Sequence, residues 1–154
     1  MTETPWRLRR ANWQADRVAL RQVREQVFIV EQQVPVEEEW DDIDPICQHV
    51  LVLDQNGLPI GTGRLTPEGK IGRMAVMAEW RKHGLGAAIL RELMDWASEI
   101  GWQKLALHAQ TQAQGFYQKF GFTPQGDVFM EAGIEHITMV GAPRRREQSQ
   151  PNPS

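Results

Sequence analysis

The sequence predicts a single domain of the α+β class, because strand-like segments that follow one another directly are combined with separate helix-like segments. Two short turn sequences, Asn56-Gly57 and Pro67–Lys70, separate apolar segments and are typical of tight connections between antiparallel strands. A loop that contains Gly84 and Gly86 then leads directly into a long amphipathic segment. The three strands before this loop are predicted at residues 49–53, 60–66 and 71–77.

The helix after the glycine loop is predicted to begin at Leu85, where apolar residues start to recur at helical spacing, and to stop before Gly101. Its apolar stripe consists of Leu85, Ile89, Leu93, Trp96 and Ile100. An earlier helix is predicted from Trp13, capped by Asn12 and with Leu20, Val23, Val27 and Val30 on one stripe. The remaining predicted elements are strands at 6–10, 104–108, 127–131 and 136–140 and a helix at 111–120.

Composition points to a soluble globular protein, with 41% hydrophobic and 24% charged residues and a net charge of −3. That charge gives no reason to expect nucleic acid as a partner, and Arg144–Arg146 form only a small solvated cluster. Cys47 is the only cysteine, so no internal disulfide can form. No apolar run has the length of a membrane span and MTETPWRLRR lacks a signal peptide's apolar segment, so we expect a cytoplasmic protein without a membrane partner.

The folded domain is predicted to occupy residues 1–141, and the Pro-, Arg-, Gln- and Ser-rich segment 142–154 is predicted to be a disordered tail. Six carboxylates crowd into the segment 37–44, around Trp40. Because such a block repels itself, we expect a loop with a solvated face, although it could instead attract a cationic amine such as a polyamine or an aminoglycoside. These residues are Glu37, Glu38, Glu39, Asp41, Asp42 and Asp44.

The loop before the long helix has the features of an anion site. The first turn of a helix has backbone N–H groups without internal partners, and the helix dipole places partial positive charge there. Glycines at 84 and 86 remove side chains that would block a phosphate, and cationic groups stand beside them. Ala87 and Ala88 exclude a nucleotide-triphosphate loop, which needs Lys and Ser or Thr there, and Ile89 replaces the third glycine of a dinucleotide fingerprint.

The spacing Arg-x-x-Gly-x-Gly after a strand, met by Arg81, Gly84 and Gly86, resembles the pyrophosphate loop of the GNAT superfamily of N-acetyltransferases, which bind acetyl-CoA. The block Gly115–Phe122 resembles the superfamily's late helix, in which Phe-Tyr is followed by Gly-Phe. With the order of the elements, the resemblance covers roughly residues 6–140. It implies the GNAT fold, a central, mostly antiparallel mixed sheet flanked by helices.

The N-terminal half is similar to a branch of small bacterial GNAT proteins whose acceptors are mostly unassigned. The resemblance to this branch rests on Val27-Phe28, Glu31-Gln32, the acidic segment and His49. What the resemblance implies is an acetyl-CoA-dependent N-acetyltransferase that acts on a small-molecule or peptide amine by direct attack of the amine on the thioester. The alternative is a coenzyme-A-binding regulatory or sensor module without efficient turnover, and a homodimer is left open.

The resemblance also names residues that would bind the coenzyme. In the superfamily the strand before the loop splays from its neighbour, and its backbone binds the pantetheine arm; the matching residues are Met74, Ala75 and Val76. Gln110 stands where the family often has an asparagine that touches the coenzyme, and it offers the same amide one methylene further out. The loop residues implied to bind pyrophosphate are Arg81, Lys82, His83, Gly84, Leu85, Gly86 and Ala87.

Tyr117, the only tyrosine in the chain, matches the residue that the family places beside the coenzyme sulfur, and is the candidate general acid. The alternative role is a tyrosine that caps the core with its hydroxyl in water. The general base is left open: Glu31 resembles a recurring residue of the branch, and His108 could titrate at working pH or be a core histidine. A metal site is not expected, since the histidines at 49, 83, 108 and 136 show no ligand spacing.

Overall fold

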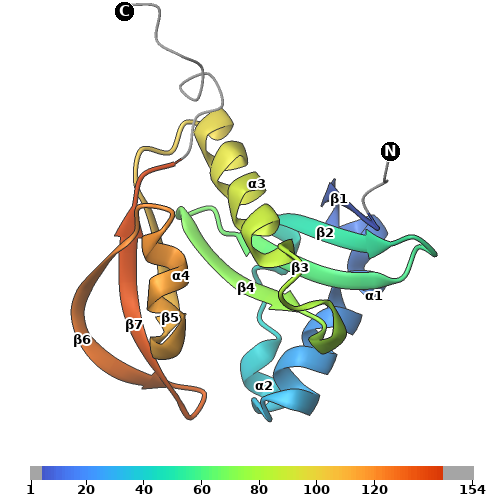
Figure 1. Ribbon diagram of the computed structural model, residues 1–154, viewed down its shortest axis with the longest axis horizontal. Coiled ribbons are helices and arrows are strands. Elements are labelled where there is room, and N and C mark those ends of the chain that lie inside the picture. The colour runs from blue at the N-terminus through green and yellow to red at the C-terminus, as the bar shows by residue number, and fades with distance from the viewer. Residues whose placement is uncertain (1–4, 144–154) are drawn as a thin grey trace, which may run out of the picture.

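The computed structural model describes residues 5–143, whose strands form one seven-stranded sheet in the order β1-β2-β3-β4-β5-β7-β6 (Figure 1). All neighbouring strands are antiparallel except β4 and β5, which are parallel. The predicted α+β class and mostly antiparallel mixed sheet are therefore confirmed. The strands are β1 (Trp6–Ala11), β2 (Gln48–Asp54), β3 (Pro59–Leu65), β4 (Lys70–Val76), β5 (Leu105–Gln110), β6 (Thr123–Glu131) and β7 (Ile134–Gly141).

Helices pack on opposite faces of the sheet. Ala75 of β4 lies in a small apolar cluster with Val23 and Val27, whereas its neighbour Met74 packs on the main core, which α3 dominates. Because successive side chains of a strand point to opposite faces, α1 and α3 must cover opposite faces. The helices are α1 (Trp13–Arg24), α2 (Val36–Glu39), α3 (Leu85–Ile100) and α4 (Gln114–Gln118), with a π-helical segment η1 (Glu25–Glu31) and the 3-10 turns η2 (Asp44–Ile46), η3 (Ala78–Trp80) and η4 (Thr111–Ala113).

A close approach between β3 and α3 ties the sheet to the long helix. A Cβ atom on Gly63 would lie 2.6 Å from Cγ2 of Ile89 and 2.9 Å from Cδ1 of Leu93, both on α3. Only glycine fits there without moving the side chains of Ile89 and Leu93. The position of α3, and with it the position of its N-terminus, is therefore fixed by contact with the middle of the sheet.

The sheet divides between β4 and β5 into two halves, which diverge in Figure 1. The two strands pair only at Lys70 with Ala106 and at Ile71 with Leu107. Beyond these pairs β4 remains bonded to β3 on its other side, where the register shifts and Arg73 adopts a positive φ of 50°. This is a β-bulge, which bends a strand and re-aims its residues. The opening between the halves therefore begins at the end of a very short parallel ladder.

Three predictions about helices differ in detail from the structure. The stripe predicted for the first helix holds for Leu20, Val23 and Val27, but Val30 is 57% exposed, because the wider π-helical segment changes the phase of the side chains. Ile100, predicted on the stripe of the long helix, is 49% exposed in its last turn. The helix predicted at 111–120 is a 3-10 turn followed by the short helix α4.

The acidic segment is only partly the solvated loop that was predicted. Glu39 and Asp44 are 3% and 2% exposed, and Nε of Arg24 donates to Oε2 of Glu39 at 2.7 Å. Asp44 Oδ1 accepts from Nη1 of Arg24 and from Nη1 of Arg64, each at 2.9 Å. The interpretation as a solvated face is therefore wrong for these two carboxylates. Their arginine partners lie on other elements, so the local charge pattern did not reveal them.

Burial and charge act in opposite directions on these carboxyl groups. Burial raises the pKa of Glu39, and the nearby guanidinium groups of Arg24 and Arg73 only partly offset this effect. For Asp44, burial also works toward a higher pKa, but the hydrogen bonds and charges of Arg24 and Arg64 outweigh it, so its pKa is lowered. Asp44 is thus held in its charged form at the centre of the network.

Most of the segment predicted to be a disordered tail, 144–154, lies outside the described residues, together with Arg144–Arg146. Ala142 and Pro143 follow β7 without regular structure. Within residues 5–143, no helix has the length and apolar character that spanning a membrane requires.

Replacing Arg24 by methionine is expected to lower the free energy of unfolding by about 3–5 kcal/mol, because two buried carboxylates lose a cationic partner. Urea denaturation followed by circular dichroism measures this change.

The matched control is Arg9→Met. Arg9 forms an ion pair with Asp16, but the Arg9 side chain is 48% exposed. Loss of this ion pair is expected to lower the free energy of unfolding by no more than about 1 kcal/mol. Equal effects of the two substitutions would show that the buried network does not stabilise the fold.

Candidate active site

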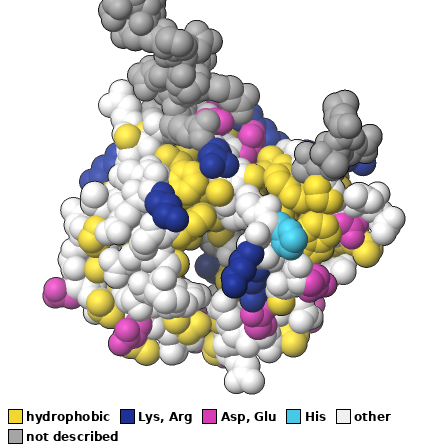
Figure 2. Space-filling view, viewed as in Figure 1, with side chains coloured by type: hydrophobic (Ala, Val, Ile, Leu, Met, Phe, Trp, Pro, Cys, Tyr) yellow, Lys and Arg dark blue, Asp and Glu magenta, His cyan; other side chains and the backbone are white. Residues whose placement is uncertain are grey.

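The opening between the halves of the sheet forms a cleft of about 550 Å³. Figure 2 shows this face of the molecule hollowed at its centre, with Lys and Arg side chains beside the hollow. Residues from both halves line the cleft: Gly72 and Met74 come from β4, His108 and Gln110 from β5, and Tyr117 from α4. Of the predicted site residues, the structure therefore brings Met74, His108, Gln110 and Tyr117 together.

The backbone of β4 is exposed toward this cleft on one side. Beyond Ile71 no residue of β4 pairs with β5, whereas Ala75 and Val76 remain paired with β3. Backbone groups of the strand that face the opening therefore lack the cross-strand partners that a continuous sheet would supply. The side chain of Ala75 itself is buried in the small apolar cluster with Val23 and Val27.

The predicted anion loop lies at the N-terminus of the 16-residue helix α3. Gly84 caps the helix with a φ of 85°, and Lys82 also has a positive φ of 68°. No side chain caps the helix and its first turn contains no acidic residue, so its N–H groups are left to an external acceptor. A Cβ on Gly86 would lie 3.6 Å from the ring of Phe116, which is ordinary contact.

Glu31, a candidate base, and Arg81, a candidate pyrophosphate ligand, form a bidentate ion pair with each other. Nη2 of Arg81 lies 2.7 Å from Oε1 of Glu31, Nη1 contacts the other carboxylate oxygen, and Nε donates to the carbonyl oxygen of Val76 at 2.9 Å. The hydrogen bonds from Arg81 lower the pKa of the Glu31 carboxyl group. A carboxylate held in this way is a weaker proton acceptor, and Glu31 is not among the described residues that line the cleft.

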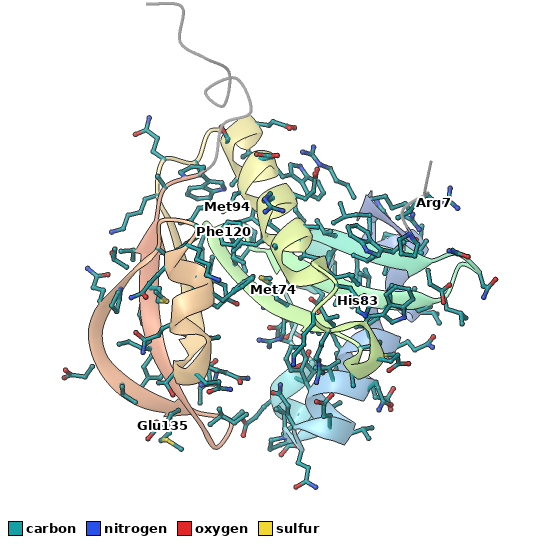
Figure 3. The ribbon with its side chains drawn as sticks, viewed as in Figure 1. Arg7, Met74, His83, Met94, Phe120 and Glu135 are labelled. Atoms are coloured by element: carbon teal, nitrogen blue, oxygen red, sulfur yellow. The ribbon has the colours of Figure 1, made fainter. Side chains whose placement is uncertain are left out.

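Tyr117 is set into an apolar corner of the cleft. Its ring packs edge-on against Phe116 and Phe122, with centroids 5.0 and 6.3 Å away. Burial raises the pKa of the hydroxyl to about 12. The hydroxyl therefore stays protonated, and it donates to Sδ of Met74 at 3.8 Å. In Figure 3 Met74 lies over β4, near the centre of the molecule, and it lines the cleft, so the hydroxyl contacts a sulfur atom at the opening.

The amide of Gln110 is engaged within the protein. Its Nε2 donates to Oε1 of Gln32 at 3.2 Å, and its Oε1 accepts from Nε2 of Gln112 at 2.7 Å. Gln32 directly follows the π-helical segment, so this contact joins the two sides of the cleft. Any contact of Gln110 with a coenzyme would have to replace or share these hydrogen bonds.

His108 is the histidine of β5, and Nδ1 of its ring lies 2.9 Å from Oε1 of Glu131. The edge of the Phe129 ring packs against it, with centroids 4.9 Å apart. Both partners come from β6, which lies two strands away from β5 in the sheet. Reasoning from the sequence missed Glu131, because nothing in the local pattern shows that a hairpin returns this carboxylate to His108.

A second hollow, of about 600 Å³, lies between α3 and α4 and was also missed. Its lining includes Ala87, Arg91 and Lys119, and the guanidinium carbon of Arg91 stands 5.5 Å from the centre of the Phe120 ring. Figure 3 shows Met94 and Phe120, which also line it, side by side between the two helices. The spacing i, i+4, i+7 places Ala87, Arg91 and Met94 on one face of α3, so the sequence did contain a signal for this surface.

Residues 17–142 match the family described as acetyltransferase (GNAT) domain. The chain therefore belongs to the GNAT acetyltransferases, which confirms the family and fold that the sequence predicted. Membership of this family makes the protein an acyltransferase that uses a coenzyme A thioester as its donor.

Two relatives and a solved structure agree with this assignment. The uncharacterized protein YyaT of Bacillus subtilis is 40% identical over 139 residues, which cover 86% of this chain and 93% of YyaT. The uncharacterized N-acetyltransferase YjcF of the same organism is 38% identical over 122 residues, covering 77% of this chain and 86% of YjcF. The crystal structure of an acyl-CoA N-acyltransferase from Pseudomonas aeruginosa is similar with a TM-score of 0.79 and 27% identity, over 89% of this chain and 99% of that chain.

Gly86→Val is expected to weaken acetyl-CoA binding by more than about tenfold, because a branched side chain would occupy the space in front of the N–H groups of α3. Calorimetric titration with acetyl-CoA measures the affinity, and thermal unfolding checks that the fold is retained.

Gly86→Ala is the graded control. It adds only the Cβ atom, whose nearest contact would be ordinary, so a smaller loss is expected. An unchanged affinity in the valine variant would remove this loop from the coenzyme site.

Proposed function

We propose that this protein is an N-acetyltransferase that transfers the acetyl group of acetyl-CoA directly to an amine. The observation that carries the proposal is one cleft that is lined both by β4, whose edge beyond Ile71 is not paired with β5, and by Tyr117, with the uncapped N-terminus of α3 following β4 in the chain. Holding both substrates in such a cleft turns a bimolecular reaction into an effectively unimolecular one.

The coenzyme would extend over three features described above. Its pyrophosphate would accept hydrogen bonds from the N-terminus of α3, helped by the positive end of the helix dipole. Its pantetheine arm would pair with backbone groups of Met74, Ala75 and Val76 on the side of β4 that faces the opening, although the carbonyl oxygen of Val76 already accepts from Arg81. Its phosphorylated nucleoside end would occupy the hollow between α3 and α4, where Arg91 and Lys119 supply positive charge.

Tyr117 would stabilise the departing sulfur. With a tyrosine pKa of about 12 and a thiol pKa of about 8.5, complete proton transfer would be uphill by roughly 5 kcal/mol. Donation of a hydrogen bond to the thiolate as it forms costs much less, and the hydroxyl already donates to a sulfur atom, that of Met74. We therefore assign Tyr117 as a hydrogen-bond donor, with the final proton of the thiol supplied through it or by water.

The charges of the cleft support a cationic acceptor. Five carboxylates and three basic side chains line it, which gives a net charge of −2 when its two histidines are neutral. A protonated amine is attracted into such a cleft. The carboxylates are Glu38, Glu39, Asp41, Glu68 and Glu131, and the basic residues are Arg64, Lys70 and Arg73. The acceptor class proposed is accordingly a small-molecule or peptide amine, met in the cytoplasm.

The test is incubation of the protein with acetyl-CoA and a pooled panel of amines, followed by mass spectrometry of acetylated products and by measurement of released thiol. Acetylation of at least one amine is expected. Tight coenzyme binding without transfer to any amine would instead favour a coenzyme-A-binding regulatory module, and no binding would exclude both.

Tyr117→Phe is expected to lower kcat by about 10²–10⁴-fold, the range for loss of a positioned proton donor. Acetyl-CoA affinity should remain nearly unchanged, since the ring keeps its contacts with Phe116 and Phe122. Steady-state kinetics should show equal losses in kcat and kcat/KM, the sign of an interaction made only in the transition state. A variant that turns over at the wild-type rate would leave Tyr117 with a packing role.

A further inference from the structure

We propose that His108 and Glu131 form a catalytic dyad, in which Nε2 of His108 takes the proton from the acceptor amine and Glu131 positions the ring. This proposal rests on the proposed N-acetyltransferase function, because it supplies the base which that reaction needs. A primary amine is mostly protonated at neutral pH and cannot attack a carbonyl carbon until it has lost a proton.

The topology of the sheet places His108 where the two substrates would meet. The last paired residues of β4 and β5 are Ile71 and Leu107, so His108 is the first residue of β5 beyond the ladder, at the apex of the opening. The coenzyme loop follows the other end of β4, after Val76, roughly 13 Å along the strand from Gly72. A thioester that enters along β4 from that loop therefore points toward the apex, and His108 lines the same cleft as Tyr117.

The contact with Glu131 determines which ring nitrogen is free. An ionised carboxylate only accepts hydrogen bonds, so Nδ1 of His108 carries the proton and donates to Oε1 of Glu131 at 2.9 Å. In the neutral imidazole Nε2 is then left with its lone pair, ready to accept a proton. The carboxylate also stabilises the imidazolium that forms, and the edge-on ring of Phe129 limits rotation of His108.

Three other candidate bases are less available to an acceptor amine than His108. Glu31 is held by Arg81, with its pKa lowered. His136 is 9% exposed, and its Nδ1 donates to the carbonyl oxygen of Ile134 at 2.7 Å. His49 is buried, its Nε2 donates to the carbonyl oxygen of Asp44, and it is absent from the described lining of the cleft. By contrast, the side chain of His108 is 31% exposed and its second nitrogen has no hydrogen-bond partner among the described residues.

The proton balance of the reaction is complete with these groups. The acceptor ammonium gives one proton to Nε2 of His108, and the nitrogen lone pair then forms the C–N bond to the thioester carbonyl carbon. As the C–S bond breaks, the sulfur leaves with the bonding electrons and is protonated to the free thiol, while the nitrogen loses its second proton. His108 returns its proton to solvent, so the net products are the amide, coenzyme A and one proton.

Several charged and titratable groups surround His108 and contribute to its environment. They are the other charged and titratable residues that line the cleft: Arg64 on β3, Lys70 and Arg73 on β4, Glu131 on β6, His136 on β7, Tyr117 on α4, Glu38 and Glu39 on α2, and Asp41 and Glu68 in loops. Of these groups, Glu131 is the one whose carboxylate contacts the ring directly, at Nδ1.

The experiment compares His108→Gln, Glu131→Gln and the control Glu135→Gln in the dependence of kcat/KM on pH, with the amine found by the product screen. Glu135 precedes His136 in the same hairpin but is exposed and does not line the cleft. The wild type should lose activity at acid pH as His108 becomes protonated. His108→Gln should lose about 10²–10⁴-fold in kcat, together with the acidic limb of the profile.

Glu131→Gln should keep part of the activity and move the acidic limb to lower pH, because an amide does not stabilise the imidazolium. Glu135→Gln should match the wild type, and calorimetry should find acetyl-CoA affinity unchanged in all three variants. A His108→Gln variant with wild-type activity, or an acidic limb that stays in place in Glu131→Gln, would overturn the dyad while leaving the acetyltransferase intact. A wild-type protein that acetylates no amine would overturn the proposed function, and the dyad with it.

Discussion

The early separation of β4 from β5 is the constraint on which the rest of the site depends. A strand in the middle of a sheet normally has both edges bonded, and unpaired backbone groups away from water are costly. Here β4 is bonded to β3 along its length but to β5 at only two positions, which leaves a stretch of backbone that a ligand or water must satisfy. The cleft is therefore a consequence of topology, and the side chains around it adapt that opening to a reaction.

The buried arginine network holds the wall of the opening that faces the N-terminal helices. Arg24 of α1 and Arg64 of β3 share the carboxylate of Asp44, and Nη2 of Arg73, at the bulge of β4, lies 3.2 Å from the Asp41 carboxylate. Because an uncompensated buried charge is expensive, these groups hold one another in place. The bulge, the acidic segment and α1 are in this way one connected unit, and the acidic segment contributes to the shape of the cleft as well as to its charge.

Periodicity and turn chemistry were enough to predict the order of elements and the sheet class, because these signals are local. The glycine loop and the block around Tyr117 were recognisable for the same reason. Two kinds of property could not be predicted. One is a local change of helix type: Val30 is exposed because a π-helical segment shifts the phase of the helix. The other is set by partners on other elements: Glu39 is buried where it pairs with Arg24, and Glu131 reaches His108 only through the pairing of β6 and β7 with β5.

Because Gly63 contacts α3, the residues that position the anion site are different from the residues that would bind the anion. Since Ile89 and Leu93 rest directly on the backbone of β3, the direction of the helix axis is set by the core and not by the residues of the loop. Substitutions at Lys82 and His83 should therefore leave the amides at the N-terminus of α3 in place. A single methyl group added at Gly63, in the interior, would instead push on Ile89 and Leu93 and so disturb the position of α3 and the ligand affinity from a distance. A residue that never meets the ligand would then behave, in a mutational screen, like part of the binding site.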